Sequence, residues 1–434
     1  MKLEINKIPA VLPDGNSVTV KTVTVFVDGG KIAGIDSKPD GFIADRTFTG
    51  NCGKLLIPGL INTHTHSYMS LFRNHADDLP FEDWLFKRIL PLEDKLTSED
   101  AYWGALLSCA EMIKTGTTCF SDMHMFKHQI LKAVNKSGMR AVLSRGLVGS
   151  FANNVLDDGS RIQDALEDIS LYQTRFNDGL VTFFLAPHAV YTCDAGYLRY
   201  VAGAAKEHDL GIHIHVSETE REVSDCISKF GMTPVAFLDS LGIFDIHTAA
   251  AHCVYLTDSD INILSEKKVN ALTNPISNMK LGNGFAPIPE LLSKGINVSL
   301  GTDSAASNNS LNMFRELSFL TLIHKGDAKD PTKISAKEGF LIATKNGAKS
   351  LKLAGSTGSV AVGFNADLAV LNLDTPNFYP RNDILAGLSY SATGSEVETV
   401  IIGGKIVMEN RELKTIDEER LYYEISRIAD RIYR

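Results

Sequence analysis

Short runs of β-branched residues at both ends of the chain have the patterning of strands. They occupy residues 18–27, 31–35, 366–373, 397–402 and 405–408. Glycine pairs at 29–30 and 403–404 separate neighbouring runs, and such pairs favour the tight turns that join strands. Neither end is long enough to form an independent sheet. We therefore predict that residues 1–55 and 355–434 come together as one small β-sandwich domain.

Between these ends, continuous apolar runs alternate with segments of helical patterning. The apolar runs lie at 54–63, 139–147, 180–187, 211–216, 248–255, 269–274 and 296–301. The helical segments lie at 97–114, where Thr97 and Asp100 resemble a capping box, and at 194–209, 257–267, 287–294 and 335–351. Such alternation predicts buried parallel strands, and its extent predicts a (β/α)₈ barrel over residues 56–354. A doubly wound sheet is the alternative, but no GxGxxG motif follows an early strand.

The composition is that of a soluble globular protein, with 44% hydrophobic and 22% charged residues. A formal net charge of -9 argues against nucleic acid or an anionic membrane as the main partner. Lys2, Glu4, Lys7 and Asp14 interrupt the first segment, so we expect no signal peptide. The sequence has no stretch of about 18 apolar residues, so we expect no transmembrane helix. The six scattered cysteines, without a CxxC pair, are expected to be reduced core thiols. These features predict a cytoplasmic protein.

Three histidines and an aspartate lie at the ends of predicted barrel strands. His64 and His66 end the run LLIPGLINTHTH, His215 ends GIHIH, and Asp303 follows NVSLGT. Side chains two apart in a strand point the same way, so His64 and His66 can bind one ion together. The carboxyl ends of barrel strands meet at one rim, where barrel enzymes keep their sites. Imidazole and carboxylate ligands suit Zn²⁺, although Fe²⁺ and Mn²⁺ accept the same set.

Two further polar residues, Glu218 and His252, lie at or just beyond the ends of two other runs. Taken singly, an HxH pair is weak evidence, and a lone carboxylate is more often a helix cap or a solvated charge. The joint placement of these groups at four strand ends favours a metal-dependent hydrolase. We expect His208 and His247 to be surface residues and His213 to be a hydrogen-bonded barrel residue or a support for a metal ligand. We expect the other three to be structural or solvated residues without a partner: His124, His128 and His324.

Six motifs, in chain order, carry a family resemblance. They are IPGLINTHTH, APHAVYTC, HIHVSET, AAHCVYL, NPISNMKLGNG and LGTDSAASNN. These motifs are similar to those of the amidohydrolase superfamily, and the chain resembles its 5-methylthioadenosine/S-adenosylhomocysteine deaminase group. The resemblance runs nearly end to end and includes the split β domain. It implies a TIM barrel that hydrolytically deaminates a nucleoside.

The resemblance also implies a role for each motif residue. The metal ligands of the family correspond to His64, His66, His215 and Asp303. Its proton-shuttling glutamate corresponds to Glu218, and its water-orienting histidine to His252, with Asp303 taking the proton of the water. Some superfamily members bridge two metals with a carboxylated lysine on the fourth strand, and the run 180–187 has no lysine. One metal ion per chain is therefore implied.

Five residues correspond to the substrate-binding positions of the family. Glu93 matches the acid that binds the ribose hydroxyls, and His188 matches a histidine that contacts the nucleoside. Arg145 and Arg161 match basic residues near the 5′ substituent, and Trp84 lies in a segment that walls the pocket. These matches imply an adenosine-type nucleoside, such as methylthioadenosine or S-adenosylhomocysteine, as the substrate.

Five positions depart from the family pattern, all on or near the rim segments. Tyr68 replaces a smaller residue, Asn74 a glycine, Tyr255 and Thr273 a histidine each, and Ser304 a glycine. Because the metal ligands are complete, these departures bear on the choice of substrate more than on the type of reaction.

Three other functions remain alternatives at this point. A related aminohydrolase or chlorohydrolase acting on guanine, a pterin or an s-triazine would keep the metal ligands and change the pocket. A metal-free structural barrel is opposed by the complete ligand set, and a nucleic-acid deaminase by the acidic net charge. The resemblance also implies a homo-oligomer.

Overall fold

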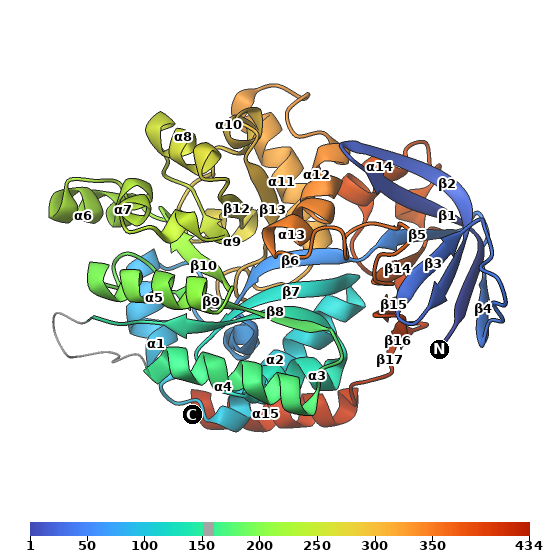
Figure 1. Cartoon of the computed structure of the whole chain (residues 1–434), viewed down its shortest axis with the longest axis horizontal. Coiled ribbons are helices and arrows are strands. Elements are labelled where there is room, and N and C mark those ends of the chain that lie inside the picture. The colour runs from blue at the N-terminus through green and yellow to red at the C-terminus, as the bar shows by residue number, and fades with distance from the viewer. Residues whose placement is uncertain (151–159) are drawn as a thin grey trace.

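Eight parallel strands form the wall of a barrel in the computed structural model, which describes residues 1–150 and 160–434 (Figure 1). The strands are β6 Leu60–Thr65, β7 Thr117–His124, β8 Arg140–Leu147, β9 Val181–Pro187, β10 Gly211–Val216, β11 Thr248–His252, β12 Asn270–Thr273 and β13 Asn297–Leu300. They follow one another in chain order around the barrel. At the seam between β13 and β6, the Thr302 N–H donates to Asn62 Oδ1 at 3.0 Å and Thr63 Oγ1 donates to the Leu300 carbonyl at 2.9 Å. The predicted (β/α)₈ barrel is confirmed.

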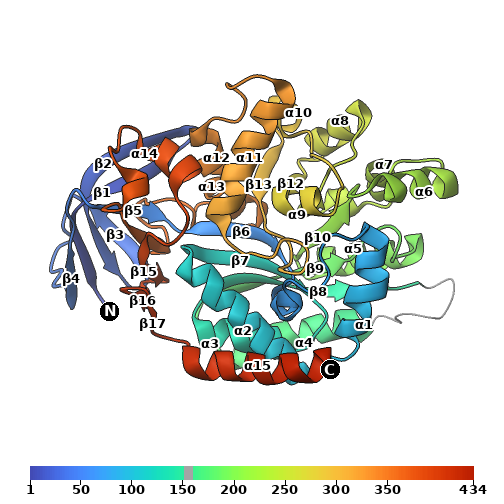
Figure 2. The same cartoon turned by 180° about the vertical axis from the view of Figure 1, so that it is seen from behind.

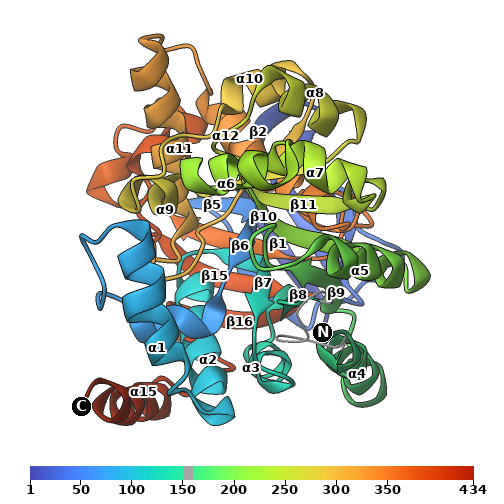
Figure 3. The same ribbon diagram turned by 90° about the vertical axis from the view of Figure 1, so that its left-hand side faces the viewer.

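Helices surround these strands, as Figure 3 shows from the side. The longer ones are α2 Ser98–Lys114, α3 Gln129–Ser137, α4 Ser160–Arg175, α5 Ala195–Glu207, α6 Glu220–Phe230, α7 Pro234–Ser240, α8 Asp258–Glu266 and α11 Met313–Ala328. The predicted capping box of Thr97 and Asp100 starts α2. The segment predicted as one helix at 335–351 is two, α12 Ala336–Ile342 and α13 Lys345–Ser350, because Thr344 between them leaves the helical conformation (φ -130, ψ -91). The predicted helix at 287–294 is α10 Ile288–Ser293.

Strands from both ends of the chain form a second, mixed sheet beside the barrel (Figures 1 and 2). They are β1 Leu3–Asp14, β2 Ser17–Asp28, β3 Lys31–Ile35, β4 Arg46–Thr49, β5 Lys54–Pro58, β14 Leu368–Asn372, β15 Val397–Ile402, β16 Lys405–Glu409 and β17 Glu412–Leu413. The two ends join where β5 pairs antiparallel with β14, with Leu56 opposite Val370. A buried aliphatic cluster that includes Leu3, Ile5 and Leu368 stabilises this sheet.

Two strand predictions were wrong in detail. The run at 54–63 is two strands in different sheets, β5 and β6, which are separated at Gly59. A side chain at Gly59 would collide with Thr118, since its Cβ would lie 2.0 Å from Thr118 Oγ1. Strand β7 was not predicted, because Thr117, Ser121 and Asp122 interrupt its apolar pattern although all three are buried.

The last helix, α15 Glu418–Tyr433, contacts α2 of the barrel (Figure 2). Tyr433 Oη donates to the Leu71 carbonyl at 2.6 Å, and Arg431 pairs with Asp100. The predicted boundaries of the β domain, at residues 55 and 355, stay a prediction. One helix of the segment assigned to that domain, α15, lies on the barrel. No helix in the two described ranges is long and apolar enough to cross a membrane. Five cysteines are buried as expected, whereas Cys52 is exposed.

Candidate metal centre and active site

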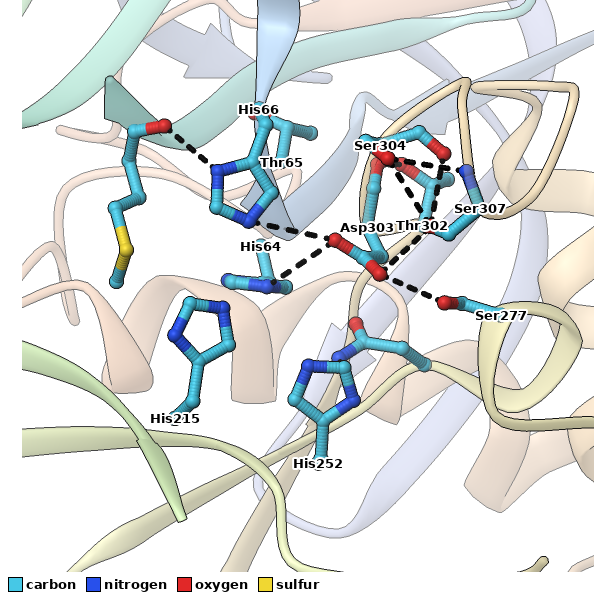
Figure 4. A network of polar contacts seen from close by, with 12 residues as sticks. His64, Thr65, His66, His215, His252, Ser277, Thr302, Asp303, Ser304 and Ser307 are labelled. Atoms are coloured by element: carbon cyan, nitrogen blue, oxygen red, sulfur yellow. Dashed lines mark hydrogen bonds and ion pairs between the residues drawn. The ribbon is translucent and has the colours of Figure 1, made fainter. Parts of the chain in front are cut away.

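Three histidines and one aspartate converge at the carboxyl ends of β6, β10 and β13 (Figure 4). One ring nitrogen from each of His64, His66 and His215 lies within 4.8 Å of the other two. Asp303 Oδ1 lies 3.5 Å from Nε2 of His64 and 3.5 Å from Nε2 of His66. The structure thus brings all four predicted metal ligands together around one point.

Hydrogen bonds at Nδ1 orient each of these imidazoles. His66 donates from Nδ1 to the Met123 carbonyl at 2.9 Å, and His215 donates to the His188 carbonyl at 2.8 Å. His64 Nδ1 lies 2.8 Å from Nε2 of His213, whose own Nδ1 lies 3.2 Å from Ser121 Oγ. A neutral ring with its proton on Nδ1 presents a lone pair on Nε2, which is the tautomer that binds a metal.

The residues present fit a divalent metal ion. His64 Nε2 is buried and makes no hydrogen bond among the described residues, although Asp303 Oδ1 lies 3.5 Å away. A buried nitrogen without a hydrogen bond is costly unless it binds something, and a metal ion shared with the Asp303 carboxylate would satisfy it. Burial lowers the pKa of His64 to about 4, so the ring is neutral and able to bind a metal near pH 7. Three imidazoles and one carboxylate are a donor set typical of Zn²⁺.

Asp303 is held so that one oxygen faces the histidines. Its Oδ2 accepts hydrogen bonds from Ser277 Oγ and Ser307 Oγ, both at 2.7 Å, and its Oδ1 is left toward the imidazoles (Figure 4). The backbone at Asp303 has a positive φ of 61, a left-handed conformation that aspartate adopts more readily than most residues other than glycine.

Glu218 and His252 lie next to this centre as a second pair. Glu218 Oε2 is 3.8 Å from His252 Nε2, and the other carboxylate oxygen accepts a hydrogen bond from Asn283 Nδ2 at 3.0 Å. Burial raises the pKa of Glu218, although the charge of His252 partly opposes this shift. His252 donates from Nδ1 to Asn278 Oδ1 at 2.8 Å. Burial lowers its pKa, but the carboxylates of Glu218 and Asp303 outweigh this and raise the pKa overall.

The five predicted substrate-binding residues are all described, and they lie on separate segments. His188 follows β9, and its ring centroid is 4.7 Å from that of His215, so it borders the metal centre. Glu93 ends the short helix α1 Leu90–Glu93, and it accepts a hydrogen bond from the Tyr68 hydroxyl. Trp84 is buried in the π-helix η2 Asp83–Ile89, and its indole Nε1 has no hydrogen-bond partner in the described part of the chain.

The two arginines lie near each other at the β8 side of the barrel. Arg145 is on β8, and Arg161 is in the first turn of α4. Burial, and then the positive charge of Arg161, lower the pKa of Arg145. Asp164 lies 3.4 Å from the Arg145 guanidinium and balances part of this charge. Two close guanidinium groups are a suitable site for a carboxylate.

Comparison with known proteins assigns this arrangement to a family. A model of the amidohydrolase family matches residues 55–407, a range that includes all four predicted metal ligands. The chain belongs to the amidohydrolase family. It is 46% identical over 415 residues to a 5-methylthioadenosine/S-adenosylhomocysteine deaminase of Caldanaerobacter subterraneus, covering 95% of this chain and 94% of that protein. It is 44% identical over 409 residues to a 5′-deoxyadenosine deaminase of Methanocaldococcus jannaschii, covering 93% and 95%.

A solved amidohydrolase fold is also similar along the whole chain. The crystal structure of an adenosine deaminase from Xanthomonas campestris with bound zinc has a TM-score of 0.92 and 32% sequence identity. The similarity covers 99% of this chain and 98% of that one. The barrel and the terminal sheet of this amidohydrolase therefore have the same arrangement as in a zinc-containing deaminase.

Several residues that organise the amidohydrolase site were not predicted from the sequence. Asp122 on β7 accepts hydrogen bonds from the Ser67 N–H at 2.6 Å and from Ser67 Oγ at 2.9 Å, and so fixes the segment after His66. Asn278 and Asn283 hold His252 and Glu218. The sequence offered one clue to each of these residues. Asp122 is a charged residue in a buried strand, and Asn278 and Asn283 lie within the motif NPISNMKLGNG.

The other histidines differ in part from expectation. His213 supports His64 as expected. His128 is not without a partner, because it pairs with the buried Asp168. His247 is partly buried and bonds to the Ser350 carbonyl at 2.9 Å, and it is not a surface residue as predicted. His124 is buried at the end of β7, where the Arg145 guanidinium lies 3.4 Å from its carbonyl oxygen.

Two of the departures from the family pattern have a visible structural role. Ser304 Oγ is 3.1 Å from Ser307 Oγ, and Ser307 in turn donates to Asp303. Asn74 has a positive φ of 60 and accepts a hydrogen bond from Asn309 at 2.6 Å, which ties the loop after β6 to the loop after β13.

Proposed function

We propose that this amidohydrolase removes the 6-amino group from adenosine-type nucleosides, giving the inosine analogue and ammonia. The observation that carries the proposal is the convergence of four metal-ligand side chains beside the Glu218–His252 pair. Relatives that are 44–47% identical are named as deaminases of methylthioadenosine, S-adenosylhomocysteine or 5′-deoxyadenosine, which supports the substrate class.

We propose one divalent ion per chain, held by His64, His66, His215 and Asp303. Zn²⁺ is the ion that suits this donor set best, and Fe²⁺ and Mn²⁺ are the alternatives. The zinc in the solved deaminase supports this choice, and the absence of a lysine in the sequence of β9 supports a single ion. A divalent ion supplies hydroxide near neutral pH by lowering the pKa of water from ~16 to about 7.

The protein side chains then carry the protons. Both serine hydroxyls donate to Asp303 Oδ2, and the other oxygen, Oδ1, accepts a proton from the attacking water. His252, held by Asn278, orients that water. Glu218 donates a proton to the ring nitrogen beside the amino-bearing carbon, and burial, which raises the pKa of Glu218, favours this role. After addition at that carbon, Asp303 passes the proton taken from the water to the amino group. The added hydroxyl returns a proton to Glu218 as the C–N bond breaks, which leaves the carbonyl of the inosine analogue and releases ammonia.

For the remaining side chains we propose the substrate-binding roles that the family resemblance implies. Glu93 binds sugar hydroxyls, since a carboxylate accepts hydrogen bonds from two donors. Arg145 and Arg161 bind the 5′ substituent, including the carboxylate of a homocysteine tail. His188, which borders His215, contacts the nucleoside, and Trp84 walls the pocket.

An ammonia-release assay tests the proposal. The compounds are S-adenosylhomocysteine, methylthioadenosine, adenosine, guanine, a pterin and an s-triazine, compared by kcat/KM. We expect the highest value for a 5′-thioether adenosine. A higher value for guanine, the pterin or the triazine would overturn the nucleoside assignment, and a tenfold preference for adenosine would overturn only the 5′ assignment.

We also propose a cytoplasmic homo-oligomer. Five buried, unpaired cysteines are typical of a reducing compartment. Size-exclusion chromatography with light scattering measures the mass, and a mass near 47.4 kDa would contradict the oligomer.

A further inference from the structure

Tyr68 lies between the metal centre and the proposed sugar-binding carboxylate. It is two residues beyond His66, in the 3-10 helix η1 Ser67–Phe72, and its side chain is buried. Its hydroxyl donates to Oε1 of Glu93, which lies at the end of α1. The Tyr68 ring packs edge-on against Phe126, with 5.1 Å between ring centroids. One side chain therefore links the segment after β6 to the helix that carries Glu93.

The backbone that carries Tyr68 has little freedom to move. The preceding residue, Ser67, is bound twice by Asp122 and accepts a hydrogen bond at its carbonyl from Ser108 Oγ at 2.5 Å. Helix α2 approaches Tyr68 at Gly104, where an added Cβ would lie 2.5 Å from the Tyr68 carbonyl oxygen. The phenol therefore presents its hydroxyl from a fixed position relative to His66.

Glu93 needs such support more than an exposed carboxylate would. It is partly buried, and burial raises its pKa, while the hydrogen bond from Tyr68 opposes that shift. A donated hydrogen bond favours the ionised form and restricts the side chain to rotamers that keep the bond. With Oε1 bound to the phenol, Oε2 is the oxygen left for a ligand.

We propose that Tyr68 is a positioning residue that sets sugar recognition, by fixing Glu93 with Oε2 directed to a substrate hydroxyl. This inference rests on the proposed function. It predicts that the enzyme discriminates nucleosides by their 2′ and 3′ hydroxyls, and that this discrimination depends on the Tyr68 hydroxyl although Tyr68 does not touch the reacting atoms.

The test compares adenosine with 2′,3′-dideoxyadenosine, which differ only in the two sugar hydroxyls. Tyr68→Phe removes one oxygen and keeps the ring that packs on Phe126. We expect KM for adenosine to rise about tenfold with kcat nearly unchanged, because a Glu93 side chain that is no longer fixed loses the equivalent of about one charge-assisted hydrogen bond to the sugar. For dideoxyadenosine, neither constant should change, and competitive inhibition constants replace KM where its turnover is slow.

Two variants and a metal assay separate this role from a general structural one. Tyr172→Phe makes the same change at another buried tyrosine, whose hydroxyl donates to Asp178 at 2.9 Å and accepts from the Leu180 N–H at 2.9 Å, and it should leave both substrates unaffected. Glu93→Gln should show the same hydroxyl-dependent loss as Tyr68→Phe. Because His66 lies near Tyr68, metal content is measured in every variant, and we expect it to match that of the wild type.

The outcomes are distinct. An equal loss for both nucleosides in Tyr68→Phe, or no loss for either, would overturn the positioning role. A Glu93→Gln variant that loses nothing specific to the sugar hydroxyls would overturn it as well. If the wild-type protein at full metal content releases ammonia neither from these two nucleosides nor from methylthioadenosine and S-adenosylhomocysteine, the proposed function itself fails.

Discussion

Replacing Glu218 by glutamine isolates the proton-transfer step. Asn283 Nδ2 donates to Glu218 Oε1 at 3.0 Å, and the carbonyl oxygen of a glutamine can accept the same bond, so the side chain should keep its place. The glutamine amide has no acidic proton to give to the ring nitrogen. The change therefore removes the acid and little else.

The expected magnitude follows from the burial of this site. General acid–base catalysis contributes about 10²–10⁴-fold to a rate. Glu218 is only 6% exposed, so bulk water cannot easily replace the lost acid. We therefore expect kcat to fall by about 10³-fold or more, which corresponds to ~4 kcal/mol of transition-state stabilisation at ~1.36 kcal/mol per factor of ten.

Ammonia release under substrate saturation measures kcat, and elemental analysis confirms the metal content of the same sample. The matched control is Glu220→Gln, two residues along, where the side chain is exposed in the first turn of α6 and should leave kcat unchanged. A metal-replete Glu218→Gln protein with near-wild-type kcat would refute the assignment of Glu218 as the acid.

Three further predictions concern the metal and the loops around it. Removal of the ion with a chelator should abolish turnover and Zn²⁺ should restore it, whereas full activity of metal-free protein would contradict the proposed chemistry. His213→Phe should weaken metal affinity about 10–100-fold in a competition titration, because His64 Nδ1 loses its partner, and unchanged affinity would mean that the contact is unimportant. For Asp77, burial raises the pKa, but hydrogen bonds from Lys280 and Asn309 lower it overall, so its stabilisation is present at neutral pH and lost as the pH falls through that lowered value. The difference in the free energy of unfolding between wild type and Asp77→Asn, followed by thermal unfolding, should therefore be largest near pH 7, at about 1 kcal/mol or less, and should shrink toward pH 3; a difference that grows in acid would contradict this sign.

Local patterning was sufficient to predict most of the barrel. Continuous apolar runs identified seven of its strand regions, because a buried parallel strand needs apolar side chains on both faces. Strand β7 failed this criterion, since its buried Thr117, Ser121 and Asp122 are polar. Helix α15 was missed because its place in the fold depends on contacts with α2 and Leu71, which are more than 300 residues away in the chain.

The sequence by itself determined the chemical character of the site. The two-residue spacing of His64 and His66 puts both imidazoles on one side of a strand, and the ends of parallel strands meet at one rim whatever loops join them. The residue types of the ligands and their positions at strand ends can be read from short stretches of sequence, without knowledge of the loops between the strands.

Only the tertiary structure decided how these groups are held. The bond from Asn283 to Glu218 joins residues 65 apart, and the bond from Tyr68 to Glu93 joins residues 25 apart on different elements. Directional hydrogen bonds of this kind need a fixed distance and angle, and these depend on how whole helices and loops pack rather than on neighbouring residues. The reaction type is therefore readable from local sequence, whereas the orientation of each catalytic oxygen and the selection of the substrate are set by packing.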